Sequence, residues 1–194
     1  YGDMHNPWDI DSYAGGSSGG SGSAVAAGQA TIAMGSDTGG SIRIPSALCG
    51  IVGLKPTFGR VSKYGVSPLG WSLDHVGPMV RTVKDAALVL NAIAGYDQMD
   101  SCSVNRPVPD FTAGLSDGIE GIRVGVPKEY FDFPVHPQVK SSVDAALVQL
   151  EKLGAKIINV DWPIFSYAFA ISTVLLITEA SAGLSKLVME KGPE

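Results

Sequence analysis

The chain has 194 residues, of which 45% are hydrophobic and 17% charged, and its net charge is −5. Such a chain is long and apolar enough to bury a sizeable core, which excludes an intrinsically disordered protein. The acidic balance offers no basic face for nucleic acid. Cys49 and Cys102 make no disulfide framework and favour a reducing compartment, here the cytoplasm. The three histidines lack ligand spacing, so the sequence predicts no metal site and no cofactor.

Glycine is concentrated in the first third of the chain, where 12 of the 24 glycines lie between Gly15 and Gly59. The run at 15–23, GGSSGGSGS, has the composition of a flexible linker. However, the uncharged, Ala-rich residues 24–30 follow it and predict a buried helix. A Gly/Ser cluster that leads into a helix N-terminus brings free N–H groups to a place that favours negative charge.

A second cluster is more specific. Residues 31–34 predict a short buried strand, which runs directly into Asp37-Thr38-Gly39-Gly40-Ser41. Two glycines before a serine allow consecutive backbone N–H groups to point at one spot beside the hydroxyl. That is the geometry of an oxyanion hole, in which each donor is typically worth about 2.7–4 kcal/mol. Taken alone, this cluster is better explained as an ordinary Gly-Gly turn.

The remainder of the chain predicts alternating helices and strands. The adjacent pair Asp74-His75 suggests a charge-relay site, but neighbouring residues rarely orient one another, so we expect a loop near the site instead.

The apolar run 162–177 is shorter than the roughly 20 residues that a membrane helix needs, and it predicts a buried or partner-facing helix. The expected elements are a helix over 82–94 with a Thr82 cap, a strand at 122–126, a helix from Pro137 to Leu153, a strand at 156–160 and a helix over 167–189. The strand–helix–strand order at 122–160 predicts a parallel βαβ unit.

Three motifs together resemble the amidase signature family: GGSSGGS at 15–21, GSDTGGSIR at 35–43 and CGIVGLKPT at 49–57. The resemblance covers at least residues 6–78 and, more weakly, the remainder. It implies an α/β fold with a mixed central β-sheet covered by helices on both faces. It also implies one amidase signature domain over 1–194 that is incomplete at both ends.

The resemblance also assigns roles to individual residues. Ser41 would be the nucleophile, and Ser17, entered through a cis Gly16–Ser17 peptide, would be the bridging serine of a Ser–cis-Ser–Lys triad. The site would be completed by an oxyanion hole from the backbone N–H groups of Thr38, Gly39, Gly40 and Ser41, and by supporting side chains of Ser18, Asp37 and Arg43.

The catalytic lysine of the family lies upstream of the GGSSGGS run, and no lysine precedes that run here. Lys55 and Lys63 match other positions of the family pattern. Serine is a weak nucleophile without a base. The 194-residue chain alone is therefore expected to have no amide hydrolysis.

The resemblance implies hydrolysis of a carboxamide, a non-peptide C–N bond, through an acyl-enzyme. A stand-alone amidase with a small-molecule amide substrate is favoured over the glutaminase-like A subunit of a tRNA-dependent amidotransferase, whose partners would be the other subunits. A non-catalytic binding fragment of the same fold is the alternative from another class. No direct nucleic-acid or membrane partner is expected, and a homo-oligomer is compatible with the sequence. Neither glycine cluster has the lysine or spacing of a nucleotide-binding loop.

Overall fold

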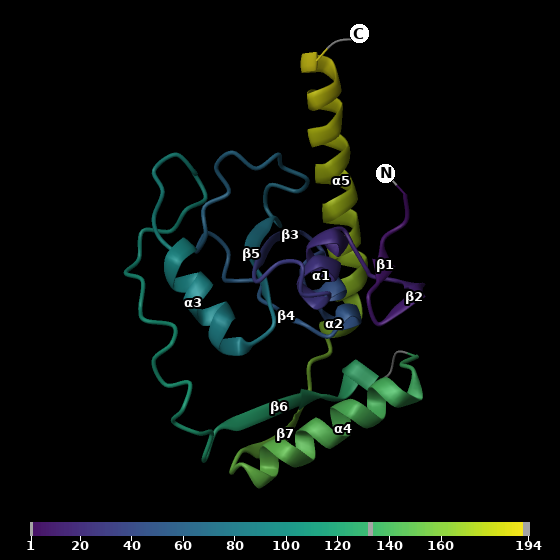
Figure 1. Cartoon of the computed structure of the whole chain (residues 1–194), viewed down its shortest axis with the longest axis vertical. Coiled ribbons are helices and arrows are strands. Elements are labelled where there is room, and N and C mark those ends of the chain that lie inside the picture. The colour runs from purple at the N-terminus through teal and green to yellow at the C-terminus, as the bar shows by residue number, and fades with distance from the viewer. Residues whose placement is uncertain (1, 132–133, 192–194) are drawn as a thin grey trace. The chain divides into compact units, whose positions relative to one another are not determined.

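The computed structural model describes residues 2–131 and 134–191 (Figure 1). The chain forms two compact units, one of residues 1–113 and 173–194 and the other of residues 114–172. Both combine helices with strands, so the predicted α/β class is confirmed. Within the described residues the strands form three small sheets, two antiparallel and one parallel, where one mixed central sheet was expected.

The first unit is built on an antiparallel sheet in the order β3-β5-β4. Its strands are β3 (Ala33–Asp37), β5 (His75–Val80) and β4 (Val52–Gly53). Strand β3 begins two residues later than the expected 31–34 and continues to Asp37, which pairs with His75. The strand extends this far because the backbones of Gly35 and Ser36 pair with β5, although glycine and serine have low strand propensity. The chain therefore passes directly from strand β3 into the second glycine cluster.

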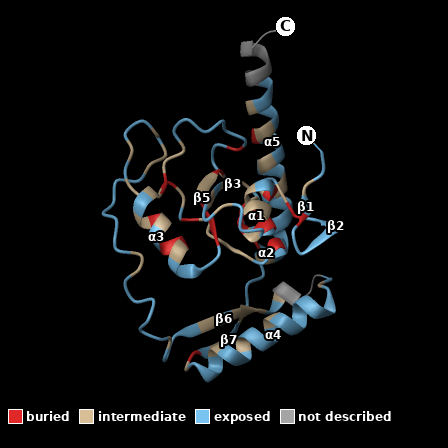
Figure 2. Cartoon of the chain, in the orientation of Figure 1, coloured by how far each residue is buried: buried red, intermediate tan, exposed pale blue. Residues whose placement is uncertain are grey.

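Helices α1 (Gly19–Ala26), α2 (Arg43–Cys49) and α3 (Val83–Ile93) belong to the same unit. Helix α1 starts within the Gly/Ser run, five residues before the predicted helix, because packing outweighs the poor helix propensity of glycine. The predicted cap of α3 is confirmed, since Thr82 Oγ1 accepts a hydrogen bond from Asp85 N at 3.1 Å. Buried residues cluster where these helices meet the sheet (Figure 2), and the fully buried side chains include Val25, Ile42, Cys49, Met79 and Val80.

A short hairpin of β1 (His5–Asn6) and β2 (Asp9–Tyr13) precedes α1. Its side chains are tied to the end of α2: Asn6 Nδ2 donates to Leu48 O at 2.7 Å, and Trp8 Nε1 donates to Cys49 O at 2.8 Å. These bonds satisfy carbonyls that have no partner inside a helix end. The hairpin therefore stabilises the C-terminal end of α2.

The second unit contains the predicted βαβ arrangement. Strands β6 (Arg123–Pro127) and β7 (Lys156–Val160) pair in parallel, and α4 (Pro137–Lys152) connects them. The 3-10 helix η1 (Lys128–Phe131) follows β6. The proline at the start of α4 has no N–H to leave unsatisfied, as expected for the first helical turn.

Helix α5 (Phe165–Lys191) confirms the predicted long helix and extends it at both ends. Residues 165–185 are long and apolar enough to cross a membrane by length and composition, a test that core helices of soluble proteins also pass. The sequence predicted a helix that is either buried or faces a partner. Only 6% of this stretch is buried within the described chain, so the described residues do not form a core around it.

Gly35 tests the packing between β3 and its neighbours. A Cβ there would lie 2.8 Å from Ser18 Oγ, 2.9 Å from Ile42 Cγ1 and 2.9 Å from Met79 Sδ. We expect Gly35→Ala to lower the unfolding free energy by about 1–3 kcal/mol, because overpacking forces neighbours from their positions. Urea unfolding of the full-length protein measures this. Gly183→Ala is the matched control, since a Cβ there would meet only Pro68 O at 3.7 Å and Leu69 O at 3.9 Å, which are ordinary contacts. Equal stability of Gly35→Ala and wild type would contradict the packing argument.

Candidate active site

The two glycine clusters lie side by side. The Gly16–Ser17 peptide is cis, as the family resemblance implied. Ser18 N donates to Ser41 O at 3.1 Å, and Ser18 Oγ bonds to both Ser36 O and Ser36 N at 3.3 Å. Ser18 therefore joins the entry to α1 with the end of β3 and with the Ser41 main chain.

Asp37 organises the turn that follows β3. Its side chain is fully buried. Its carboxylate accepts hydrogen bonds from Gly40 N at 2.8 Å, Ile42 N at 3.2 Å and Arg43 N at 3.3 Å. The Arg43 guanidinium donates to both carboxylate oxygens, from Nε at 2.9 Å and from Nη2 at 2.8 Å. Burial alone would raise the pKa of Asp37, but the hydrogen bonds and charge of Arg43 outweigh it and lower that pKa.

The turn at 38–41 leaves several backbone donors unused. Within the described residues, the amide N–H groups of Thr38, Gly39 and Ser41 have no protein acceptor, whereas that of Gly40 is held by Asp37. The side chain of Ser41 is half-buried and that of Ser17 is exposed. The arrangement can therefore present three amide donors within one short loop that ends at a serine hydroxyl, rather than the four that were expected.

Asp74 holds the same turn from another segment, a role that the sequence did not reveal. Its buried carboxylate accepts the Thr38 hydroxyl at 2.5 Å, Leu69 N at 2.9 Å and Gly70 N at 3.0 Å. Thr38 and Asp74 are 36 residues apart, so no local pattern could have paired them. Asp74 is a brace for the turn.

The neighbouring His75 takes no part in a charge relay with Asp74. Its Nδ1 lies 2.6 Å from Leu73 O, and since a carbonyl only accepts, Nδ1 carries the proton. Burial is the largest influence on His75, and with the positive charge of Lys55 it lowers the histidine pKa. His75 begins strand β5 and pairs with Asp37 of β3, where a loop was expected.

Helix α5 brings a third buried carboxylate to this region, after those of Asp37 and Asp74. Glu179 accepts a hydrogen bond from Ser72 N at 3.0 Å and another from Ser72 Oγ. One turn earlier, Leu176 packs so closely that a Cβ on Gly39 would lie 3.0 Å from its Cδ1. The sequence did contain a signal for this contact: an acidic residue within an otherwise apolar helix indicates a carboxylate that is hydrogen-bonded inside the protein.

The two lysines that follow the motifs point elsewhere. Lys55 Nζ donates to Pro56 O at 3.1 Å, and Lys63 Nζ donates to Trp71 O at 2.9 Å. Burial, followed by repulsion from Arg43, lowers the pKa of Lys55. Neither ammonium group has Ser17 as a hydrogen-bond partner within the described residues. No group of three or more His, Cys, Asp or Glu in the described chain could hold a metal ion.

A cis peptide within the first glycine cluster, and a carboxylate-braced turn with free amides in the second, fit an amide-hydrolase type of site. The family model Amidase matches residues 1–193. The chain therefore belongs to the amidase family, specifically to the amidase signature group that its motifs resemble.

Individual relatives carry more specific names. The chain is 52% identical over 186 residues to the A subunit of glutamyl-tRNA(Gln) amidotransferase from Geobacter sp. (strain M21), covering 96% of this chain and 38% of that protein. The crystal structure of the corresponding protein from Thermotoga maritima matches with a TM-score of 0.90 and 44% identity, over 93% of this chain and 40% of that one. The peptide amidase of Stenotrophomonas maltophilia matches with a TM-score of 0.82 and 40% identity, over 94% and 38%. The chain thus spans about two fifths of the length of these relatives.

The Asp37–Arg43 pair predicts a specific pH dependence. Arg43→Gln should lower the unfolding free energy by about 1–3 kcal/mol at pH 7, because it leaves a buried carboxylate without its charged partner. The folded-state pKa of Asp37 is lowered, so the pair stabilises the fold above the unfolded pKa of about 3.9 and loses this effect as pH falls through the folded pKa. The difference between wild type and Arg43→Gln should therefore shrink below about pH 4.

Urea unfolding of the full-length protein at pH 7, 5 and 3 measures this difference. Arg81→Gln is the control, since Arg81 is exposed and has no partner within the described residues. A difference that stays constant down to pH 3 would show that Asp37 does not titrate through this pair.

Proposed function

We propose that the protein is an amidase that forms an acyl-enzyme on Ser41. Ser41 Oγ attacks the carbonyl carbon of the amide while its proton passes to Ser17, which gives its own hydroxyl proton to a base and later returns a proton to the leaving nitrogen. The amide N–H groups of Thr38, Gly39 and Ser41 stabilise the negative oxygen of the tetrahedral intermediate. The C–N bond then breaks, and ammonia or an amine leaves with the transferred proton. Water hydrolyses the ester and restores Ser41 with a carboxylate as product.

The turn at 38–41 carries this proposal. An oxyanion hole must be rigid before the reaction to be effective, because reorganisation during the reaction costs energy. Asp37 fixes the turn through Gly40 N, and Asp74 fixes it through the Thr38 hydroxyl. The three unengaged amides and the Ser41 hydroxyl lie on that braced segment.

The base of the reaction is the part that this chain does not supply. Lys55 and Lys63 are bonded to backbone carbonyls and do not suit a relay through Ser17. We assign the base to the lysine that the family places upstream of the GGSSGGS motif, outside residues 1–194. A lysine acts as a base when burial lowers its pKa enough to keep it neutral.

For the substrate, we favour glutamine and the role of the glutaminase-like component in a tRNA-dependent amidotransferase. Support comes from the 52% identity to the Geobacter protein and from the match to the Thermotoga structure. This assignment reverses the preference that the sequence alone suggested. Other amidotransferase subunits would then be partners.

A stand-alone amidase is the second candidate. The segment WSLDHVGP at 71–78 resembles free-standing amidases, and the peptide amidase of Stenotrophomonas is 40% identical. The third candidate is a non-catalytic protein that retains Ser17 and Ser41. It differs from the two amidase candidates because it would have no activated serine.

Glutamine-dependent ammonia release tests the proposed function. We expect the full-length protein, purified with any subunits that accompany it, to release ammonia from glutamine. Ser41→Ala should reduce the rate by about 10³-fold or more, since the other hydroxyl on the turn, that of Thr38, is held by Asp74. A fluorophosphonate probe should label Ser41 in wild type, as peptide mass mapping would show.

The matched control is Ser116→Ala, which removes an exposed serine outside the site. Hydrolysis of other amides without turnover of glutamine would favour the stand-alone amidase. An unlabelled Ser41 in a folded protein without turnover would overturn the amidase proposal itself.

Thr38→Val separates positioning from chemistry. The substitution removes the hydroxyl that donates to Asp74 and keeps both the shape of the side chain and the backbone amide. We expect kcat to fall about tenfold, because a less rigid turn stabilises the oxyanion less well. KM should change little. Ser62→Ala, which removes a hydroxyl bonded to Asp97 away from the turn, is the control. A rise in KM at constant kcat would assign Thr38 to substrate binding instead.

A further inference from the structure

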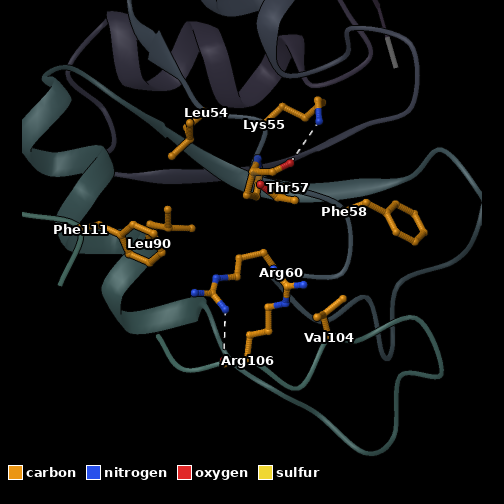
Figure 3. A pocket seen from close by; sticks show the side chains of 10 residues that line it. Leu54, Lys55, Thr57, Phe58, Arg60, Leu90, Val104, Arg106 and Phe111 are labelled. Atoms are coloured by element: carbon orange, nitrogen blue, oxygen red, sulfur yellow. Dashed lines mark hydrogen bonds between the residues drawn. The ribbon is translucent and has the colours of Figure 1, made fainter. Parts of the chain in front are cut away.

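A cavity of about 650 Å³ lies in the first unit, apart from the turn at 38–41 (Figure 3). Its walls are the segment 54–60, the loop residues Val104, Arg106 and Phe111, and Leu90 from α3. The volume is within the range of small-molecule sites, about 300–1,000 Å³. None of the groups in the proposed reaction lines it.

The cavity has an excess of positive charge. Among its ten lining residues Arg60 and Arg106 are cations and none is acidic, while the ammonium of the third cation, Lys55, is turned away from the arginines toward Pro56 O. This contrasts with the chain as a whole, whose net charge is −5. Figure 3 shows the two arginine side chains in the middle of the cavity wall. Such clustering costs repulsion energy unless an anion offsets it.

Arg60 is held in place before any ligand arrives. Its Nη1 donates to Arg106 O at 3.2 Å and its Nη2 donates to Pro107 O at 2.7 Å. The guanidinium carbon lies 5.7 Å from the centre of the Phe111 ring. Since a guanidinium has five N–H donors, these two bonds leave others for a ligand.

Arg106 has no charge partner of its own within the described residues. The acid nearest in sequence, Asp110, is engaged by Asn91 Nδ2 at 2.9 Å and by the hydroxyl and amide of Thr112. The Arg106 side chain is exposed, so it can reach a ligand at the mouth of the cavity. The cavity thus combines one fixed and one free guanidinium.

We propose that this cavity binds a small organic carboxylate with an aromatic or branched apolar body. A planar carboxylate matches the planar donor fork of arginine, which favours it over a simple point anion. The apolar body would contact Leu54, Leu90 and Val104, which line the same cavity. An inorganic anion would satisfy the cations and leave this apolar wall in water.

Benzoate is the probe for this site in the full-length protein. Saturation-transfer NMR should give saturable binding, with weaker binding of benzyl alcohol, which lacks the charge, and of inorganic phosphate, which lacks the ring. Arg106→Gln should weaken benzoate binding about tenfold, the loss of one charged hydrogen bond. Arg106→Glu should weaken it further. Both variants should fold, because the side chain is exposed and unpaired.

Lys84→Gln is the matched control, because Lys84 is an exposed cation on α3 that does not line the cavity. This variant should leave the affinity for benzoate unchanged.

Carboxylates are also products of the proposed amidase, so benzoate could bind at Ser41. Ser41→Ala in the same titration separates the two sites. Absence of saturable benzoate binding, or binding that Arg106→Gln leaves intact, would overturn this proposal and would not affect the amidase assignment.

Discussion

The buried carboxylate of Asp37 is the interaction on which the site depends. An ionised carboxylate loses several kcal/mol of solvation energy on burial unless donors replace the water. Here three backbone amides and the two N–H groups of Arg43 replace it. These donors all come from the six residues that follow Asp37, so satisfying the charge also fixes the path of the chain from β3 into α2. Ser41 lies within that path.

The same turn is supported from outside by segments that are distant in sequence. Asp74 holds Thr38, and Leu176 of α5 packs against Gly39. Glu179, one helical turn after Leu176, holds the loop that precedes Asp74 through Ser72. The two buried acids therefore immobilise adjoining loops, each by accepting N–H and O–H donors. The turn is rigid because its neighbours are also anchored, as a preorganised oxyanion hole requires.

Local pattern and motif resemblance predicted much of the fold, because periodicity reports which face of an element is apolar. Helices α3 and α4 and the parallel pair of β6 and β7 follow from it directly. The cis Gly16–Ser17 peptide came from the resemblance alone. The start of α1 was misplaced because glycine and serine have low helix propensity, which tertiary packing overrode. The bond between Ser72 and Glu179 joins residues 107 positions apart, a distance over which a single sequence carries no pairing signal.

The site separates chemistry from substrate choice. Its proposed working groups are backbone amides and two hydroxyls, which can act on the carbonyl of any carboxamide regardless of the attached groups. The surrounding carboxylates are all occupied by the protein itself: Asp37 by the turn and Arg43, Asp74 by Thr38 and its own loop, and Glu179 by Ser72. None of these three is left to recognise the α-ammonium group of an amino acid such as glutamine. If glutamine is the substrate, the groups that distinguish it from other amides are expected to lie beyond the turn.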